Sequence, residues 1–330
     1  MSAWAAALGR PRQAATEFID RRLPNLLAKR RDEVLPVTLH QRRIYIVPSG
    51  FGFAFAIMML AILAGALNYN NNGAMLYGLL PVSLALISML QTFRNLDRLA
   101  VVHVAADPVH AGEWMSVEVH LRASDARPRF GIELRLGDSR CVVDMRSGET
   151  GVARLQCRAV QRGLQSLQPI RISCIWPFGL FFAWSYVHPA FRALVYPRPE
   201  AGTPSLPEAL DRAKSSGQSL GEDELRSLRD WQIGDPTRLI AWKASARRDE
   251  LLVRQLESPR SRNLLFDYAE LAGLDPEARL SRLTRWILMA EQQGHQYQLR
   301  LPGWLSARGS GSDQRHQCLR SLALHGIASA

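Results

Sequence analysis

The run FGFAFAIMMLAILAGAL at residues 51–67 decides the architecture of the first part of this chain. A second apolar run, GAMLYGLLPVSLALISML, follows at residues 73–90. No charged residue occurs between Arg43 and Arg94, and a soluble domain rarely keeps so long a window free of charge. With its uncharged flanks, each run reaches the length of about 20 residues that a helix needs to cross a bilayer core. The sequence therefore predicts two transmembrane helices.

The predicted hairpin covers residues 44–93, with spans at about 44–67 and 73–93 joined by the Asn-rich turn 68–72. Lysine and arginine flank the hairpin, and the turn between the spans has neither. The positive-inside rule then places the N- and C-termini in the cytoplasm and the turn outside. The alternative is a buried helical hairpin of a soluble protein. The flanking cations are Lys29, Arg30, Arg31, Arg42 and Arg43 on one side, and Arg94 and Arg98 on the other.

The charge balance points to an anionic partner. The chain has 330 residues and a formal net charge of +11, which favours nucleic acid, acidic lipid or an acidic protein face. Its four cysteines are scattered without CxxC spacing. That pattern is typical of reduced core thiols and argues against a disulfide framework or a zinc site.

A basic arm and a β-rich module lie on either side of the hairpin. Residues 1–43 form the arm, either a helix on anionic headgroups or a solvated cytoplasmic segment. Residues 94–199 show short runs of alternating apolar and polar residues separated by turn signals, which predicts an antiparallel β-sandwich-like module. Within it, the aromatic run 176–182 is interpreted as a strand end and turn that seal the core. Residues 200–220 are predicted to be a linker.

The C-terminal residues 258–330 alternate between strand and helix patterns. Strands are expected at 262–266 and 295–301, and helices at 275–293 and 314–325. This order is that of a parallel sheet with covering helices, so the sequence predicts a small, truncated α/β module and a multi-domain α+β chain overall.

Residues 221–257, GEDELRSLRDWQIGDPTRLIAWKASARRDELLVRQLE, combine tryptophan, arginine, aspartate and a Gly-Asp-Pro turn. This mixture is costly to bury unless its charges pair, and it carries no catalytic triad, phosphate loop or paired-carboxylate pattern. We expect either a structural network or a protein-recognition surface, since tryptophan and arginine are enriched at binding hot spots. Arg238, Trp242 and Ser245 share a predicted helix face. The candidate residues are Arg229, Trp231, Gly234, Asp235, Arg238, Trp242, Lys243, Ser245 and Arg247.

The spacing of this motif resembles that of the bacterial domain of unknown function 58 family. Members typically have an N-terminal membrane hairpin with an Asn-rich turn, then Arg-Gly, then Pro-Phe-Gly-Leu-Phe, then the long Trp/Arg/Asp element. Here the corresponding residues are 68–72, 162–163, 177–181 and 228–247, so the resemblance runs from about residue 44 to 257. It implies a multi-pass protein of the bacterial inner membrane. It also implies partnership with a MoxR-type AAA+ ATPase and a transglutaminase-like membrane protein.

The resemblance further implies that the C-terminal module is similar to a degenerate von Willebrand factor A domain. Such domains hold a divalent metal through Asp-x-Ser-x-Ser after the first strand. Here the stretch beginning at Asp267 reads DYAEL, which keeps the aspartate and lacks both serines. Because magnesium requires oxygen ligands, we expect no metal and no cofactor.

Together these patterns favour a non-enzymatic, membrane-anchored adaptor or assembly factor that presents a protein-binding surface. A first alternative is a membrane-bound hydrolase that uses Asp235 or Asp267. A second alternative is a nucleic-acid-binding protein, suggested by the net charge. It is disfavoured because the arginines are dispersed and the membrane-flanking cations already have a topological explanation.

Overall fold

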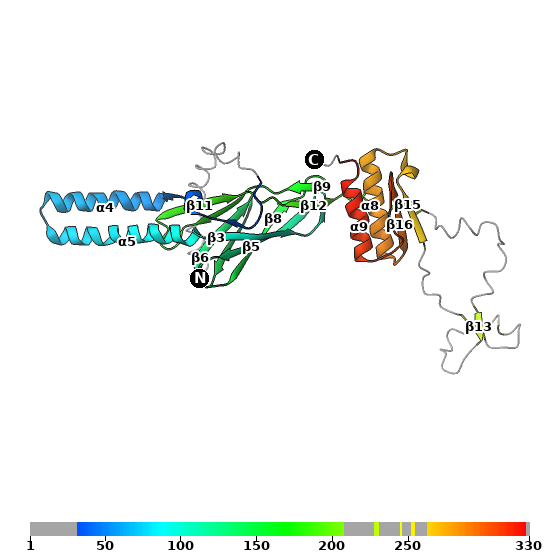
Figure 1. The fold of residues 1–330 in the computed structure, drawn as a ribbon, viewed down its shortest axis with the longest axis horizontal. Coiled ribbons are helices and arrows are strands. Elements are labelled where there is room, and N and C mark those ends of the chain that lie inside the picture. Colours follow the sequence, from blue (N-terminus) through cyan, green and yellow to red (C-terminus); the bar gives the residue numbers. More distant parts are fainter. Residues whose placement is uncertain (1–31, 208–227, 231–244, 246–251, 255–262, 328–330) are drawn as a thin grey trace. The chain divides into compact units, whose positions relative to one another are not determined.

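The computed structural model describes residues 32–207, 228–230, 245, 252–254 and 263–327 (Figure 1). The chain divides into two compact units, residues 1–195 and 196–330. The first unit contains the helical hairpin and most of the β-strands, and the second contains the α/β elements. Each unit is described by itself.

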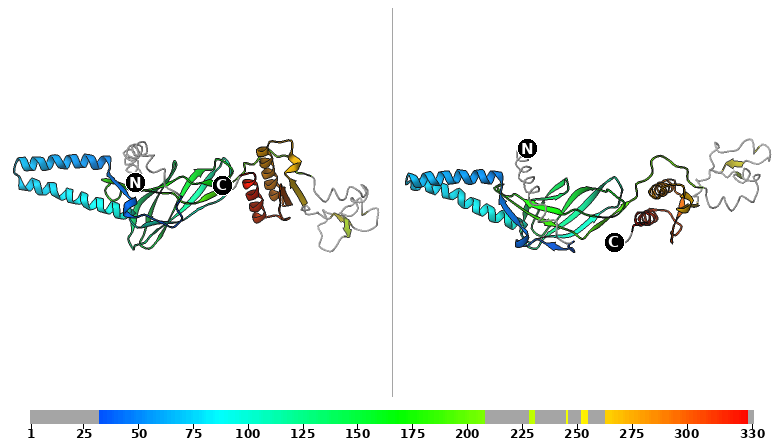
Figure 2. Two further views of the ribbon diagram at one scale, coloured as in Figure 1. Left: turned by 45° about the horizontal axis from the view of Figure 1, so that its top comes forward. Right: turned by 90° about the horizontal axis from the view of Figure 1, so that it is seen from above.

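Two long helices, α4 (Gly50–Asn68) and α5 (Asn72–Leu96), lie side by side as a hairpin in every view (Figures 1 and 2). Ser49 and Asn71 cap their N-termini, accepting hydrogen bonds from the amides of Gly52 and Ala74 at 2.9 and 3.0 Å. These side chains satisfy amides that the first turn of a helix leaves unbonded. Each helix therefore starts directly after a residue whose side chain caps it, at the beginning of an apolar run.

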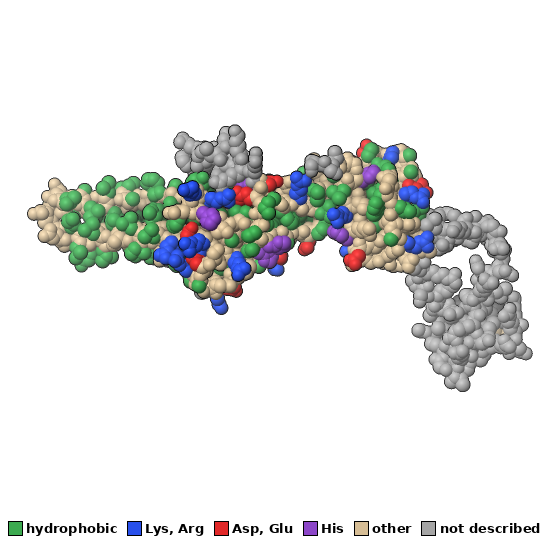
Figure 3. Space-filling view, in the orientation of Figure 1, with side chains coloured by type: hydrophobic (Ala, Val, Ile, Leu, Met, Phe, Trp, Pro, Cys, Tyr) green, Lys and Arg blue, Asp and Glu red, His purple; other side chains and the backbone are tan. Residues whose placement is uncertain are grey.

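The outer surface of the hairpin is apolar. Large side chains such as Leu60 and Leu76 are about 70% exposed, and the space-filling view shows no charged side chain over most of the two helices (Figure 3). A core helix of a soluble protein would bury such residues. Both helices are long and apolar enough to cross a membrane, which agrees with the predicted hairpin and with membrane association.

The first helix begins at Gly50, so the predicted start at residue 44 is wrong. Residues 41–43 form a 3-10 turn, and β2 (Tyr45–Pro48) pairs antiparallel with β11 (Phe181–Val187). Pro48 has no amide hydrogen and disfavours helix at the residue before it, and here the segment pairs as a strand instead. The second helix ends at Leu96, slightly beyond the predicted residue 93.

The two larger sheets of the β-module are antiparallel and share one apolar core. Alternate residues of the central strands, such as Val117, Val119, Ile132 and Leu134, are fully buried, as the period-two pattern predicts. One sheet has the order β1 (Val37–Thr38), β3 (Leu99–Ala106), β5 (Trp114–Ala123) and β8 (Thr150–Arg158). The other has the order β2, β11, β10 (Ile170–Cys174), β6 (Arg129–Leu136) and β7 (Ser139–Met145). A smaller sheet joins β4 (Val109–His110), β12 (Arg192–Tyr196) and β9 (Gly163–Ser166).

Residues 33–48 belong to the β-module, although their first part was predicted to be a cytoplasmic arm and their last part a membrane span. The strands β1 and β2 add to the edges of the two sheets. Arg43 donates two hydrogen bonds to the Glu33 carboxylate, at 2.7 and 3.0 Å. The chain therefore passes through both sheets before it enters the hairpin. The rest of the predicted arm, residues 1–31, lies outside the described residues.

The second unit contains the predicted parallel pair. Strands β15 (Asn263–Asp267) and β16 (Gln296–Leu301) are parallel and are connected through α8 (Pro276–Gln292). Asp275 caps α8, and Pro276 occupies its first turn, where a missing amide hydrogen costs nothing. The remaining elements are η3 (Ala269–Leu271), β17 (Trp304–Leu305) and α9 (Ser312–Leu324).

Part of the predicted linker packs on α8 instead. Glu200 accepts two hydrogen bonds from Arg282, both 2.8 Å long, and the backbone carbonyl of Ser205 accepts one from the Trp286 indole at 3.0 Å. Arg282 and Trp286 are four residues apart and so lie on one helix face. The Arg282 guanidinium lowers the pKa of Glu200, which keeps the carboxylate charged. Residues 208–220 of that linker lie outside the described residues.

Two glycines of α4 provide a matched test of how closely the hairpin sits on the β-module. A Cβ at Gly52 would lie 2.0 Å from the backbone oxygen of Leu180, whereas a Cβ at Gly65 would meet nothing within 4 Å. We predict that Gly52→Ala lowers the free energy of unfolding by about 1–3 kcal/mol because a backbone must shift. Gly65→Ala is predicted to raise it by up to about 1 kcal/mol through helix propensity. Reversible unfolding in mixed micelles measures both, and equal effects would contradict the packing described.

Candidate functional site

Within the sequence motif at 221–257, the structure describes residues 228–230, 245 and 252–254. Strand β13 (Leu228–Asp230) pairs antiparallel with β14 (Leu252–Arg254), and Arg229 lies opposite Val253. Ser245 is buried. The ends of the motif are therefore joined as a two-stranded ladder. The other predicted site residues lie outside the described residues, as does the shared helix face predicted for Arg238, Trp242 and Ser245. The predicted site residues outside the described part of the chain are Trp231, Gly234, Asp235, Arg238, Trp242, Lys243 and Arg247.

Asp267, the other predicted candidate, ends β15 and is engaged by its neighbours. Its Oδ2 lies 3.0 Å from Nη1 of Arg300, which is its partner in the parallel register, and its Oδ1 accepts the Ala269 amide at 2.9 Å. The carboxylate is therefore neutralised and oriented by the fold. Among the described residues, no group of three or more His, Cys, Asp or Glu side chains is placed to hold a metal ion.

The described cysteines have the character of buried or unreactive thiols. Burial raises the pKa of Cys157, and it raises that of the fully buried Cys318 to about 11. A thiol with a raised pKa is protonated at neutral pH and is a poor nucleophile. Neither side chain is suited to covalent catalysis.

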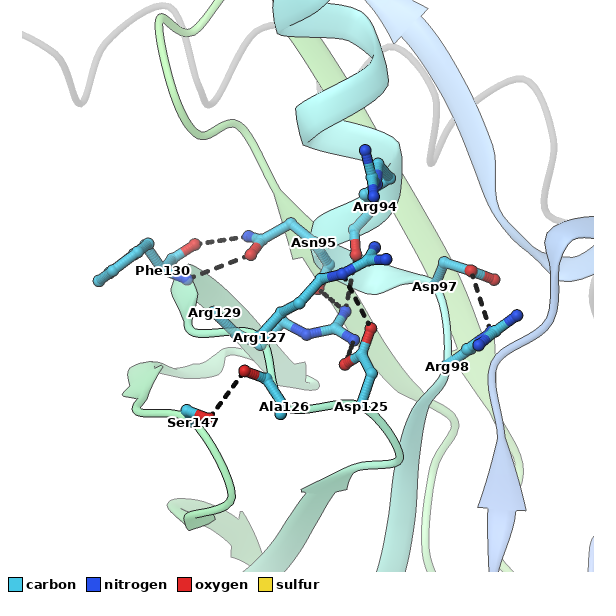
Figure 4. A network of polar contacts seen from close by, with 10 residues as sticks. All are labelled: Arg94, Asn95, Asp97, Arg98, Asp125, Ala126, Arg127, Arg129, Phe130 and Ser147. Atoms are coloured by element: carbon cyan, nitrogen blue, oxygen red, sulfur yellow. Dashed lines mark hydrogen bonds and ion pairs between the residues drawn. The ribbon is translucent and has the colours of Figure 1, made fainter.

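A largely buried polar network lies where α5 meets the β-module (Figure 4). Arg129 on β6 is about 1% exposed, and its Nη1 donates to the backbone carbonyls of Arg94 and Asn95 at 2.8 and 2.7 Å. Its Nη2 donates to Oδ1 of Asp125 at 2.5 Å. The last carbonyls of a helix have no partner within the helix, and a cation there also opposes the negative end of the helix dipole. Arg129 therefore caps α5 from another element.

Asn95 adds a second tie between α5 and β6. Its Nδ2 donates to the carbonyl of Phe130 at 2.7 Å, and its Oδ1 accepts the Phe130 amide at 3.2 Å (Figure 4). The side-chain amide thus pairs with a peptide group as a neighbouring strand would. Nδ2 also lies 2.8 Å from the Cys174 sulfur. We call Asn95, Asp125, Arg129 and Phe130 the junction network.

The alternation of apolar and polar residues does not predict the junction network, because β6 contains a local irregularity. Strand alternation with Ile132, Leu134 and Leu136 inward predicts an outward side chain at an odd-numbered position. The β6–β7 register shifts between Arg129 and Ile132, and Gly131 has a φ of +61°. This bulge reverses the alternation and turns Arg129 inward. The Arg-x-Gly spacing was the available signal, and it is weak by itself.

The junction network has no free nucleophile, and each charged group in it is paired. It fixes position rather than performing chemistry. The role of its parts is energetic, because a buried guanidinium that lost Asp125 would be an uncompensated charge.

Comparison with known proteins identifies one family. Residues 227–270 match the family model described as "Protein of unknown function DUF58". The match covers the described strands β13, β14 and β15, including Asp267. No curated protein matches the chain, and no solved structure matches it.

Removal of Arg129 tests the junction network. We predict that Arg129→Ala lowers the free energy of unfolding by about 3–5 kcal/mol, because it leaves two helix carbonyls without their partner and Asp125 without its buried one. Arg127 is the matched control, since it approaches the same carboxylate at 3.6 Å but is 51% exposed. Arg127→Ala is predicted to cost at most about 1 kcal/mol. Denaturation in micelles, followed by tryptophan fluorescence, distinguishes the two, and similar losses would contradict the assignment.

Proposed function

We propose that this chain, whose residues 227–270 match the domain of unknown function 58 family model, is a membrane-anchored, non-enzymatic adaptor. In this proposal it resides in a bacterial inner membrane and presents a protein-binding surface on the cytoplasmic side. Its partner is a MoxR-type AAA+ ATPase, together with a transglutaminase-like membrane protein. The binding surface is the motif at residues 221–257.

The observation that carries the proposal is the continuity between the hairpin and the β-module. Only two residues separate the end of α5 at Leu96 from the start of β3 at Leu99. The backbone amides of both are hydrogen bonded. The Asp97 amide donates to the Phe93 carbonyl at 3.0 Å, and the Arg98 amide donates to the Leu39 carbonyl at 2.9 Å. With the junction network, this connection holds the β-module at a set position on the helices. Such a connection suits a membrane-anchored protein whose β-module keeps a fixed position relative to its membrane helices.

The distribution of charge supports the proposed topology. Arg42 precedes the hairpin and Arg94 and Arg98 end it, whereas the opposite end consists of the Asn-rich turn at residues 68–72. Cations are retained on the cytoplasmic side during insertion. Both termini are therefore assigned to the cytoplasm.

We prefer the adaptor to the hydrolase because of the contacts that Asp267 makes. Both of its carboxylate oxygens are engaged, by Arg300 and by a backbone amide. A general base or nucleophile needs an oxygen directed at a substrate. Asp235, the other candidate for hydrolysis, lies outside the described residues.

We also propose that the second unit is a reduced von Willebrand factor A-like module. Its support is the parallel pair β15–β16 connected through α8, with an aspartate at the end of the first strand. In this reading the Arg300 guanidinium occupies the charge-neutralising role that a divalent cation would otherwise have beside Asp267.

Fusions to the C-terminus test the orientation. We predict that a C-terminal green fluorescent protein is fluorescent and that a C-terminal alkaline phosphatase is inactive, because the tail stays in the cytoplasm. The same reporters inserted in the turn at residues 69–71 should give the opposite pattern. An active phosphatase at the C-terminus would contradict the proposed topology.

Affinity capture from solubilised membranes tests the partner. We predict that the full chain recovers an AAA+ ATPase and that the double substitution Trp242→Ala/Arg247→Ala abolishes recovery, since tryptophan and arginine carry much of the energy of typical interfaces. The control is Trp114→Ala/Arg154→Ala, which removes an exposed tryptophan and an exposed arginine from the β-module. Recovery that is absent with the unaltered chain, or equal in both variants, would overturn the proposal.

A further inference from the structure

The segment Ile175–Leu180, which we call the 175–180 loop, connects β10 to β11 beside the hairpin. Its turn is closed by a hydrogen bond of 2.9 Å from the Gly179 amide to the Ile175 carbonyl. Gly179 has a φ of +70°, a left-handed conformation that favours glycine. Within the aromatic run that was interpreted as sealing the core, Trp176 packs against the core, whereas Phe178 at the tip of the loop is 52% exposed.

The 175–180 loop lies directly on both helices. Ser49, at the start of α4, donates its hydroxyl to the Gly179 carbonyl at 2.5 Å and its amide to the Leu180 carbonyl at 2.8 Å. Gly52 lies so close to Leu180 that a side chain there would overlap the carbonyl. On α5, the Thr92 hydroxyl donates to the Trp176 carbonyl at 2.8 Å. The loop therefore has a defined position along the hairpin.

That position falls within the thickness of a bilayer. At about 1.5 Å per residue, Gly52 is about 24 Å from Asn68 along α4, and Thr92 is about 30 Å from Asn72 along α5. A hydrocarbon core is about 30 Å thick. If the Asn-rich turn lies at one surface, the loop meets the helices at the inner edge of the opposite surface.

The chemistry of the loop suits that depth. No charged residue occurs between Arg171 and Arg192. The carbonyls of Trp176, Gly179 and Leu180 accept hydrogen bonds from Thr92 of α5 and from Ser49, the N-cap of α4, which lowers the cost of placing this non-helical backbone near lipid. The Trp176 ring packs on Phe130, with ring centroids 5.3 Å apart. Tryptophan is enriched at this level of membrane proteins.

We propose that the 175–180 loop is a third membrane contact of this chain, with Phe178 inserted among the acyl chains of the cytoplasmic leaflet. Trp176 and Phe130 lie at the interface, and the exposed Arg94 meets the headgroups two residues beyond Thr92. The occupant of this apolar tip is lipid, because the tip is continuous with the lipid-facing surface of α4 and α5. The inference rests on the proposed membrane hairpin and adds a contact that fixes the orientation of the β-module.

Photocrosslinking of the full chain in phospholipid nanodiscs tests the inference. A benzophenone amino acid is placed at position 178, and the nanodisc contains a phospholipid with a clickable acyl chain. Position 80 on α5, where Leu80 is 65% exposed, is the control for lipid contact. Position 114 on β5, where Trp114 is 64% exposed, is the control for an exposed apolar site away from lipid.

We expect lipid adducts at positions 178 and 80 and no lipid adduct at position 114. Adducts at 80 without adducts at 178 would overturn the inference and leave the membrane hairpin intact. The absence of adducts at both 80 and 178 would overturn the hairpin itself. A protein–protein adduct at 178 in place of the lipid adduct would assign the tip to a second copy of the chain and would also overturn the inference.

Discussion

One buried guanidinium holds the end of a membrane-length helix to a β-sheet. Arg129 donates to the final carbonyls of α5 and is neutralised by Asp125, so a single side chain completes the helix and joins it to β6. Exposed ion pairs contribute little, but a buried charge that loses its partner is costly. The position of the hairpin on the β-module depends on this contact, which Asn95 and the 175–180 loop reinforce.

The hairpin, the β-strands and the parallel α/β pair could be predicted from the sequence because each has a local signal. The charge-free window predicts two helices of membrane length, and they are present as α4 and α5. The pattern at 275–293 predicts α8 closely, since Asp275 and Pro276 mark its start. The family motif could also be identified, because residues 227–270 carry its distinctive spacing.

The remainder depends on contacts between residues far apart in the sequence. Strand β1 has two residues and gains its identity only from pairing with β3. Glu200 and Ser205 lie in a Pro- and Ser-rich stretch typical of linkers, and they are fixed by Arg282 and Trp286 of α8. Arg129 turns inward only because of the bulge at Gly131. None of these positions has a strong sequence signal of its own.

Hydrogen exchange of the full chain in nanodiscs tests the central claim, that the hairpin and the β-module are locked without a hinge. The amides of Asp97, Arg98 and Phe130 are each hydrogen bonded at the junction. The account predicts that they exchange as slowly as amides of the central strand β5. Exchange at the rate of unbonded surface turns would show a flexible tether and would contradict the account.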